Sequence, residues 1–174
     1  MKAILLSAVL MLPLSAEQGT IPNPAINYQE FARLTTELAP VREKHRVTEE
    51  QFIAMAAEPG TIVFDARTTD KFEITHVRGA RHLPFTDFTE EALAKVIPDK
   101  NTRILIYCNN NFDNEPVAFA RKGAVVSLNI QTFINLHAYG YKNVYELGPL
   151  LDVWTTKIPL VKTVNGLRIV PSSK

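Results

Sequence analysis

Two periodicities of hydrophobic residues alternate along this chain. Apolar runs of strand length lie at residues 61–64, 80–83, 104–107 and 144–147. Between those runs, apolar residues recur at helical spacing in residues 90–97 and 127–138. Strands that alternate with helices favour a mainly parallel sheet with helices on both of its faces. We therefore predict an α/β fold.

Two capping patterns predict helices before the first of these strands. Asn27 begins one helix, with Glu30 three residues later, and Thr48 begins another, with Gln51 three residues later. An Asn or Thr side chain that accepts a first-turn N–H, with Glu or Gln reaching back, stabilises the start of a helix. Pro59 follows the end of the second helix. We expect the first to be a short helix that packs on the domain as part of an N-terminal extension.

The N-terminus has the pattern of a secretory signal. Lys2 precedes a short apolar run over residues 3–14, and Ala16 offers a small residue for cleavage. The run is too short to span a bilayer, which needs about 20 apolar residues. We expect residues 1–16 to be a signal peptide, and the mature protein to be periplasmic or secreted, without membrane attachment after cleavage.

The rest of the chain shows no linker or internal repeat that would divide it into two domains. We assign residues 17–45 to the N-terminal extension, residues 46–156 to a single α/β domain and residues 157–174 to a C-terminal tail. Asn165-Gly166 lies between apolar residues in that tail, and this dipeptide favours a tight hairpin turn. The tail is therefore expected to form a hairpin.

Charge is balanced along the sequence. Nineteen basic and eighteen acidic residues give a formal net charge of +1, without a basic cluster. Nucleic acid and anionic lipid are held by such clusters, so this composition argues against both as partners. Small or neutral molecules fit better. A protein partner is possible, but the sequence does not identify one.

Cys108 is the only cysteine, and it follows the apolar strand predicted at residues 104–107. The carboxyl ends of parallel strands are where ligands bind in open α/β sheets. In an oxidising compartment, an unpaired cysteine stands out because thiols there are normally paired. Cys108 is thus an inert buried thiol, an intermolecular bridge or a reactive group.

Three segments, in order, carry a family resemblance. They are Asp65-Ala66-Arg67 followed by residues 72–84, the strand that ends at Cys108, and residues 140–147 with Trp154. Together they resemble the rhodanese-like domain family over residues 46–154. The resemblance implies a mainly parallel five-stranded sheet with helices on both faces.

The resemblance also implies a chemistry. Active members move a sulfane sulfur from a donor such as thiosulfate or a polysulfide to a thiol or cyanide acceptor, through a persulfide on the cysteine. That role would fall on Cys108, and no cofactor is implied. The chemistry needs a thiolate, whereas a free cysteine has a pKa of about 8.5. We expect loop amides or a nearby cation to lower the pKa of Cys108.

The segment after the cysteine departs from the family. Active members have a loop of about six residues, with glycine and arginine, that leads into a helix, whereas residues 109–126 separate Cys108 from the expected helix cap at Ser127. Such an insertion costs only about 1 kcal/mol in chain entropy. Alternatively, Asn114 could begin a short helix through Lys122, which would restore a six-residue loop.

Several residues of this segment are candidates for substrate binding. Asn109, Asn110, Asn111 and Phe112 follow the cysteine directly, and Arg121 and Lys122 are the only cations between Cys108 and Ser127. Cations would help to hold an anionic sulfur donor.

Two other functions are compatible with the same residues. A non-catalytic rhodanese-like binding module would keep Cys108 only as a small core residue. An oxyanion-processing enzyme of the phosphatase or arsenate reductase kind would use a longer cysteine loop, but the lack of arginine just after Cys108 argues against it.

The polar residues near the first resemblance segment are expected to have structural roles rather than catalytic or metal-binding ones. Glu73, His76 and His82 match no zinc-binding spacing, so no metal is expected. We expect Arg67 to form a structural pair with Glu73.

Overall fold

The computed structural model describes residues 21–164 and 167–169. Its centre is a five-stranded sheet in the order β1-β7-β5-β2-β4, and every pairing in it is parallel. The strands are β1 (Arg46–Val47), β7 (Val144–Leu147), β5 (Ile104–Tyr107), β2 (Ile62–Asp65) and β4 (Arg81–His82). The predicted fold class, including the five-stranded parallel sheet, is confirmed.

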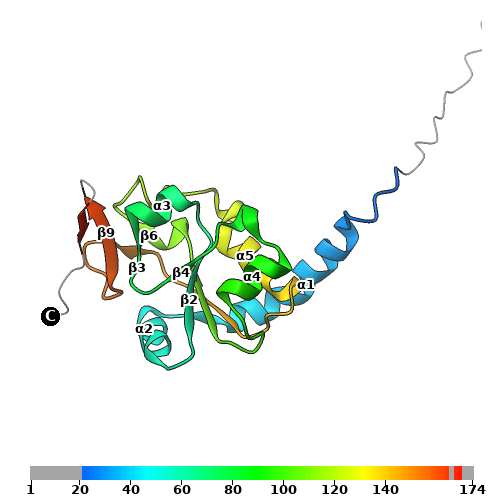
Figure 1. The fold of residues 1–174 in the computed structure, drawn as a ribbon, viewed down its shortest axis with the longest axis horizontal. Coiled ribbons are helices and arrows are strands. Elements are labelled where there is room, and N and C mark those ends of the chain that lie inside the picture. The colour runs from blue at the N-terminus through cyan, green and yellow to red at the C-terminus, as the bar shows by residue number, and fades with distance from the viewer. Residues whose placement is uncertain (1–20, 165–166, 170–174) are drawn as a thin grey trace, which may run out of the picture.

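Helices α1, α4 and α5 cover one face of this sheet (Figure 1). Their bounds are α1 (Tyr28–Lys44), α4 (Glu90–Val96) and α5 (Leu128–Ala138). Each contributes apolar side chains to one buried cluster, for example Leu38, Leu93 and Phe133. These helical side chains pack on β2, β5 and β7, so one face of the central strands is fully covered.

The opposite face is covered by α2 and by a smaller sheet. The helices here are α2 (Glu49–Ala57) and α3 (Thr69–Ile74), and the smaller sheet joins β3 (Thr75–Val77), β9 (Leu160–Val164) and β10 (Leu167–Ile169). Phe52 of α2 and Leu160 of β9 belong to the second buried cluster, with Val63 and Leu105 of the central sheet. Burial on both faces explains why these strands read as continuous apolar runs.

Strand β5 is the most deeply buried strand, because it lies between β7 and β2 at the centre of the sheet. Its residues Ile104, Leu105 and Ile106 are inaccessible to solvent. Burying one such side chain contributes about 1.5–3 kcal/mol. The strand that delivers the cysteine is therefore held firmly in place.

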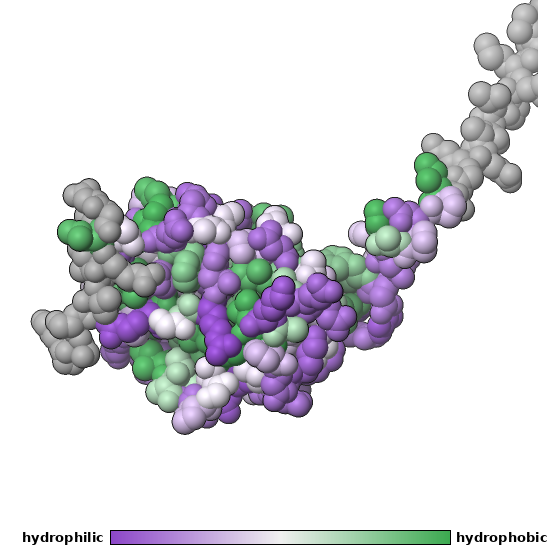
Figure 2. Space-filling view, in the orientation of Figure 1, coloured by the Kyte–Doolittle hydropathy of each residue, from purple (hydrophilic) through white to green (hydrophobic). Residues whose placement is uncertain are grey.

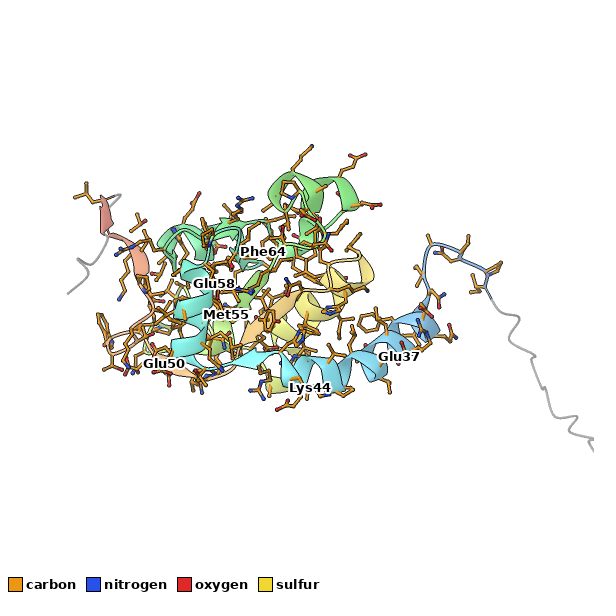
Figure 3. The ribbon with its side chains drawn as sticks, turned by 90° about the horizontal axis from the view of Figure 1, so that it is seen from below. Glu37, Lys44, Glu50, Met55, Glu58 and Phe64 are labelled. Carbon is orange, nitrogen blue, oxygen red and sulfur yellow. The ribbon has the colours of Figure 1, made fainter. Side chains whose placement is uncertain are left out.

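Helix α1 is longer than its sequence pattern suggested, and its first turns lie away from the domain. Asn27 caps it as predicted by accepting the N–H of Glu30 at 2.9 Å. In Figure 3, α1 runs from Lys44, beside the domain, outward past Glu37. Figure 2 shows hydrophobic side chains exposed close to its beginning. Ile26, just before the helix, and Tyr28, its first residue, are largely solvent-accessible. Only the carboxyl-terminal half of α1 packs on the domain.

The capping box of α2 confirms a further prediction, and the tail contains two antiparallel strands. Thr48 accepts the N–H of Gln51 at 3.2 Å, and the Gln51 side chain accepts the Thr48 N–H at 2.9 Å. Strands β9 and β10 pair antiparallel with Val164 opposite Leu167, whereas Asn165 and Gly166 lie outside the described residues. The predicted signal peptide, residues 1–16, also lies outside them.

The segment between Cys108 and α5 contains three short elements and one turn. A 3-10 helix, η2 (Asn109–Asn111), leads into β6 (Phe112–Asp113), which pairs parallel with β8 (Leu151–Asp152). A turn over residues 116–119 and a second 3-10 helix, η3 (Ala124–Val126), follow. The alternative helix from Asn114 to Lys122 is wrong. Asn114 has a left-handed backbone, with φ 63°, which does not begin a helix.

No helix among the described residues is long and apolar enough to cross a bilayer.

Candidate active site

A buried ion pair fixes the ends of the two strands beside the cysteine. Arg67 and Asp65 are both inaccessible to solvent and joined at 2.6 Å, and the Tyr107 hydroxyl donates to the same carboxylate. Arg67 also donates to the carbonyls of Ala118 and Thr75. The predicted pair of Arg67 with Glu73 is therefore wrong, because the guanidinium binds Asp65 and backbone carbonyls instead. This network joins β2 and β5 to residues 109–126, the inserted segment between Cys108 and Ser127.

Cys108 directly follows β5, at the carboxyl end of the sheet. Its Sγ accepts the N–H of Asn110 at 3.4 Å and lies 3.5 Å from the Ser127 hydroxyl. Ser127 precedes α5, and the backbone N–H of Asn129, in the first turn of that helix, hydrogen-bonds to the thiol and acts to lower its pKa. The sulfur thus faces the positive end of an eleven-residue helix, where a negative charge is stabilised.

The Asn111 side chain holds the cysteine loop in shape. Its Oδ1 accepts the Cys108 N–H at 2.8 Å and an amide hydrogen of Asn129 at 2.9 Å. Its Nδ2 donates to the carbonyls of Leu147 at 2.7 Å and Pro149 at 3.2 Å. One buried amide therefore links the ends of β5 and β7 with the start of α5.

Burial has the largest effect on the pKa of the Cys108 thiol. Cys108 is 1% exposed, and this burial raises the pKa of its thiol, with a further contribution from the Glu146 carboxylate. Ser127 and the N–H groups of Asn110 and Asn129 act in the opposite direction without outweighing burial. The expectation of a lowered pKa is therefore wrong, because desolvation of the thiolate exceeds the stabilisation that the loop amides supply.

A pocket of about 310 Å³ opens beside Cys108 and Ser127. Its charged lining residues are Arg42, Arg46 and Glu146, and Arg42 Nη2 lies 2.6 Å from Glu146 Oε1. Sequence reasoning missed these three side chains. Glu146 gave a usable signal, because it interrupts an apolar strand. The two arginines gave none, because their place in the same pocket as the cysteine depends on how α1 and β1 pack on the sheet.

The structure divides the predicted binding residues among three pockets. Asn110 and Asn111 line the pocket beside Cys108. Asn109 and Lys122 line a separate pocket of about 620 Å³, although the Lys122 backbone and the Asn110 side chain hydrogen-bond to each other. The assignment of these residues to substrate binding stays a prediction.

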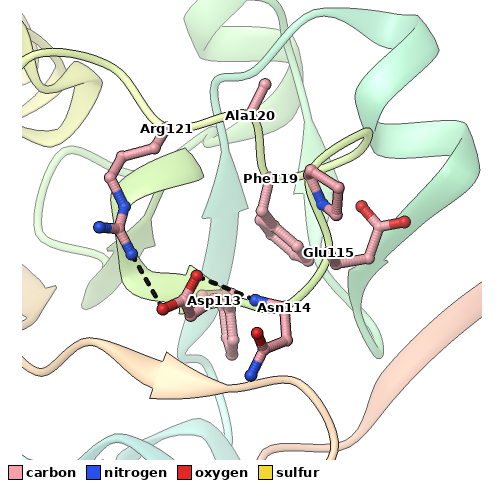
Figure 4. Close-up of a pocket in the computed structure, with 8 residues that line it drawn as sticks. Asp113, Asn114, Glu115, Phe119, Ala120 and Arg121 are labelled. Carbon is pink, nitrogen blue, oxygen red and sulfur yellow. Dashed lines mark hydrogen bonds and ion pairs between the residues drawn. The ribbon is translucent and has the colours of Figure 1, made fainter.

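Phe112 and Arg121 line a third pocket, of about 400 Å³, in the inserted segment (Figure 4). Phe112 is buried, and its ring centroid lies 4.7 Å from that of Phe119. Arg121 forms an exposed ion pair with Asp113 at 3.0 Å. Neither residue lines the pocket beside Cys108, and their predicted role in substrate binding is untested.

Within the part of the chain that the structure describes, no group of three His, Cys, Asp or Glu side chains could hold a metal ion. His76 and His82 stack on Phe72, with ring centroids 4.0 and 4.4 Å away.

The comparisons with known proteins agree with this architecture. The rhodanese-like domain model matches residues 48–154, and the chain therefore belongs to the rhodanese-like domain family. The thiosulfate sulfurtransferase PspE of Escherichia coli is 28% identical over 94 residues, which cover 54% of this chain and 75% of PspE.

Solved structures of the family are also similar to this chain. A rhodanese with anions from E. coli is 25% identical, with a TM-score of 0.40, over 59% of this chain and 98% of its own. The Alr3790 protein from Anabaena is 18% identical, with a TM-score of 0.44, over 58% of this chain and 68% of its own.

Proposed function

We propose that this protein is a sulfurtransferase that carries a sulfane sulfur as a persulfide on Cys108. The observation that carries the proposal is the position of Sγ at the carboxyl end of β5. There it faces the start of α5, accepts the Asn110 N–H and lines a pocket with two arginines. Membership of the rhodanese-like family and the likeness to PspE support it.

In this mechanism the Cys108 thiol first releases its proton to solvent. The thiolate then attacks the outer sulfur of a donor such as thiosulfate, the bond between the two donor sulfurs breaks, and sulfite leaves with its electron pair. The product carries a new bond between Sγ and the transferred sulfur. An acceptor thiolate or cyanide removes that sulfur in a second step and restores the Cys108 thiolate.

The surroundings of Cys108 stabilise a negative charge on the outer sulfur of the persulfide better than one on Sγ itself. The outer sulfur of a persulfide extends beyond Sγ into the pocket, so it is less buried than the thiol itself. The N–H groups at the start of α5 and at Asn110 are fixed before the reaction, and fixed donors stabilise a developing negative charge at no cost in reorganisation. The site would thus favour the loaded protein.

A second function, that of a non-catalytic binding module, is favoured by one observation. Cys108 is almost inaccessible, and burial raises the pKa of its thiol. A small residue kept only for packing would show the same features.

Intact mass spectrometry of the purified protein after incubation with thiosulfate or a polysulfide separates the two functions. A sulfur carrier gains the mass of one sulfur atom, the gain disappears on addition of cyanide, and Cys108→Ser shows none of it. Because Cys108 is the only cysteine, any such adduct reports this residue. If the wild-type protein gains no sulfur from either donor, the binding module is the better interpretation.

We also propose that the protein acts outside the cytoplasm. The basis is the sequence pattern of residues 1–16, a positive start and a short apolar run before a small residue.

A further inference from the structure

Two residues that line the pocket beside Cys108 each have a buried oxygen atom that accepts no hydrogen bond. The atoms are Glu146 Oε2 and Asn129 Oδ1, on residues that are 5% and 2% exposed. Neither atom has a partner among the described residues. A buried acceptor without a donor is unfavourable, so a ligand that donates hydrogen bonds would be stabilised there.

The Asn129 amide orientation follows from its neighbours. Asn111 donates through its Nδ2 to two backbone carbonyls, so its Oδ1 must be the atom that faces Asn129. Asn129 must then donate to it through its own Nδ2, at 2.9 Å, which leaves Asn129 Oδ1 as the unpaired end. The hydrogen bonds of Asn111 therefore fix the orientation of the Asn129 amide and leave its Oδ1 without a donor.

The same pocket also presents positive charge. Arg42 is held by Glu146 through one nitrogen, and its Nε has no partner among the described residues. Arg46 has a side chain that is 39% exposed, and it bonds to the Gly148 carbonyl at 3.2 Å and to the exposed Glu43 at 3.5 Å. The ion pair with Glu43 is long and the Arg46 side chain is partly exposed, so its guanidinium can also contact an anion in the pocket.

We propose that this pocket selects a sulfur acceptor that carries both an ammonium group and a carboxylate, that is, an amino-acid thiol such as cysteine. The ammonium donates to Glu146 Oε2 and Asn129 Oδ1, and the carboxylate binds Arg46, with Arg42 beside it. A volume of about 310 Å³ accommodates a ligand of this size. The inference rests on the proposed persulfide at Cys108 and names the class of molecule that unloads it.

The reaction it assigns is a transfer between two thiols. The acceptor thiolate attacks the outer sulfur of the Cys108 persulfide and forms a new sulfur–sulfur bond. The bond from that sulfur to Sγ breaks, and its electron pair stays on Sγ. Before the transfer, the outer sulfur of the persulfide, which forms as an anion, takes a proton from solvent. The products are the acceptor persulfide, which keeps that proton, and the Cys108 thiolate. No external oxidant or reductant is needed.

Both arginines lie outside the region that the family model matches, which begins at residue 48. Arg42 belongs to the last turn of α1, and Arg46 to β1, which pairs with β7 so that Arg46 lies opposite Glu146. The end of α1 and strand β1 therefore supply the carboxylate-binding half of the site, and strand β7 and helix α5 supply the ammonium-binding half.

Three probe thiols separate the two halves. Cysteine carries both groups, cysteamine lacks the carboxylate and 3-mercaptopropionate lacks the ammonium. Wild-type protein loaded with sulfur is mixed with each thiol at equal thiolate concentration, and loss of the persulfide is followed by intact mass. Because charge-assisted hydrogen bonds form to each group, we expect cysteine to unload the protein about tenfold faster, or more, than either partial probe.

Variants then assign each preference to a side chain. Glu146→Gln should reduce the advantage of cysteine over 3-mercaptopropionate, and Arg46→Ala should reduce its advantage over cysteamine. Arg33→Ala is the matched control, because Arg33 lies on the same helix α1 in exposed ion pairs with Glu30 and Glu37. Ratios between probes are compared because Glu146→Gln also changes the acidity of Cys108 for every probe alike.

The outcomes distinguish this inference from the proposed function. Equal rates for the three probes on loaded wild-type protein would overturn the amino-acid thiol while leaving the persulfide carrier intact. The same follows if Arg46→Ala and Arg33→Ala leave identical ratios. If no donor loads the wild-type protein, the proposed function fails. Binding of cysteine to the Cys108→Ser protein, measured by calorimetry, then decides whether the pocket recognises the zwitterion.

Discussion

Two opposing effects meet at Cys108. Burial disfavours the thiolate, whereas the Asn110 N–H and the start of α5 favour it. In this structure burial prevails, so the thiol is the stable form at neutral pH. A sulfur carrier in this state would react slowly in its unloaded form, and its rate would increase with pH.

The pH dependence of alkylation tests this balance. Because the pKa of Cys108 is raised by burial, the fraction of thiolate should stay small below the ordinary cysteine pKa of about 8.5 and increase only above it. Iodoacetamide labelling of the folded protein should therefore have a midpoint above that of the same protein in urea. A labelling rate that reaches its plateau below pH 8 would contradict the raised pKa.

Asn111 should matter more for stability than its neighbour Asn110. Asn111→Ala removes four hydrogen bonds and leaves buried backbone groups unpaired, which costs about 1–3 kcal/mol for each unsatisfied group. Urea unfolding should show a clearly lower midpoint. Asn110→Ala is the control, because its amide bonds only to the exposed backbone of Lys122 and should change the midpoint little. Equal losses in the two variants would argue against Asn111 as the linking residue.

At the residue scale, sequence reasoning located the cysteine and the strand that delivers it, but only part of its surroundings. Asn110 and Asn111 lie beside Cys108 because they follow it directly. Arg42, Arg46 and Glu146 come from distant parts of the chain, and their convergence depends on the β1–β7 and β5–β7 pairings. A single sequence does not reveal which strands become neighbours.

Among the elements, the position of α5 is the least expected, because a long segment separates it from Cys108 in the sequence. The segment lengthens the connection, yet it returns the start of α5 to within 3.5 Å of the sulfur, at Ser127. Strand β6 makes this return compatible with the core by pairing with β8. The helix that faces the cysteine is thus preserved while the loop is changed.

If the inserted segment is part of the core, substitutions of its buried residues should lower the free energy of unfolding much more than substitutions of its exposed residues. Phe112→Ala should cost about 3–5 kcal/mol, because the ring is buried against Phe119 and Tyr107. Arg121→Ala should change stability by no more than about 0.5 kcal/mol, because its ion pair with Asp113 is exposed. Thermal or urea unfolding of both variants measures the difference, and similar small losses would show that the segment is only loosely attached.

Strand positions were predicted from sequence better than the connections between them. Residues 104–107 and 144–147 are the observed β5 and β7, because runs of apolar residues of that length are typical of central strands. The helix considered for residues 114–122 failed because the local pattern omitted the pairing of β6 with β8 and the left-handed backbone of Asn114. Long-range pairing determined this segment.

For the molecule as a whole, the sequence predicts a location outside the cytoplasm. If residues 1–16 are a signal peptide, expression in a Gram-negative host should yield a periplasmic product that begins at or near Glu17. Cell fractionation and N-terminal mass mapping measure this. Recovery of an intact Met1 form from the cytoplasm of the native cell would contradict export.

Both edges of the central sheet are short. The outermost strands, β1 and β4, have two residues each, so they present few unpaired backbone groups to another chain. Long flat edges act as templates for strand addition and aggregation, and short ones do not. The folded domain should therefore resist fibril formation through this sheet, and assembly into ordered β aggregates should require unfolding first.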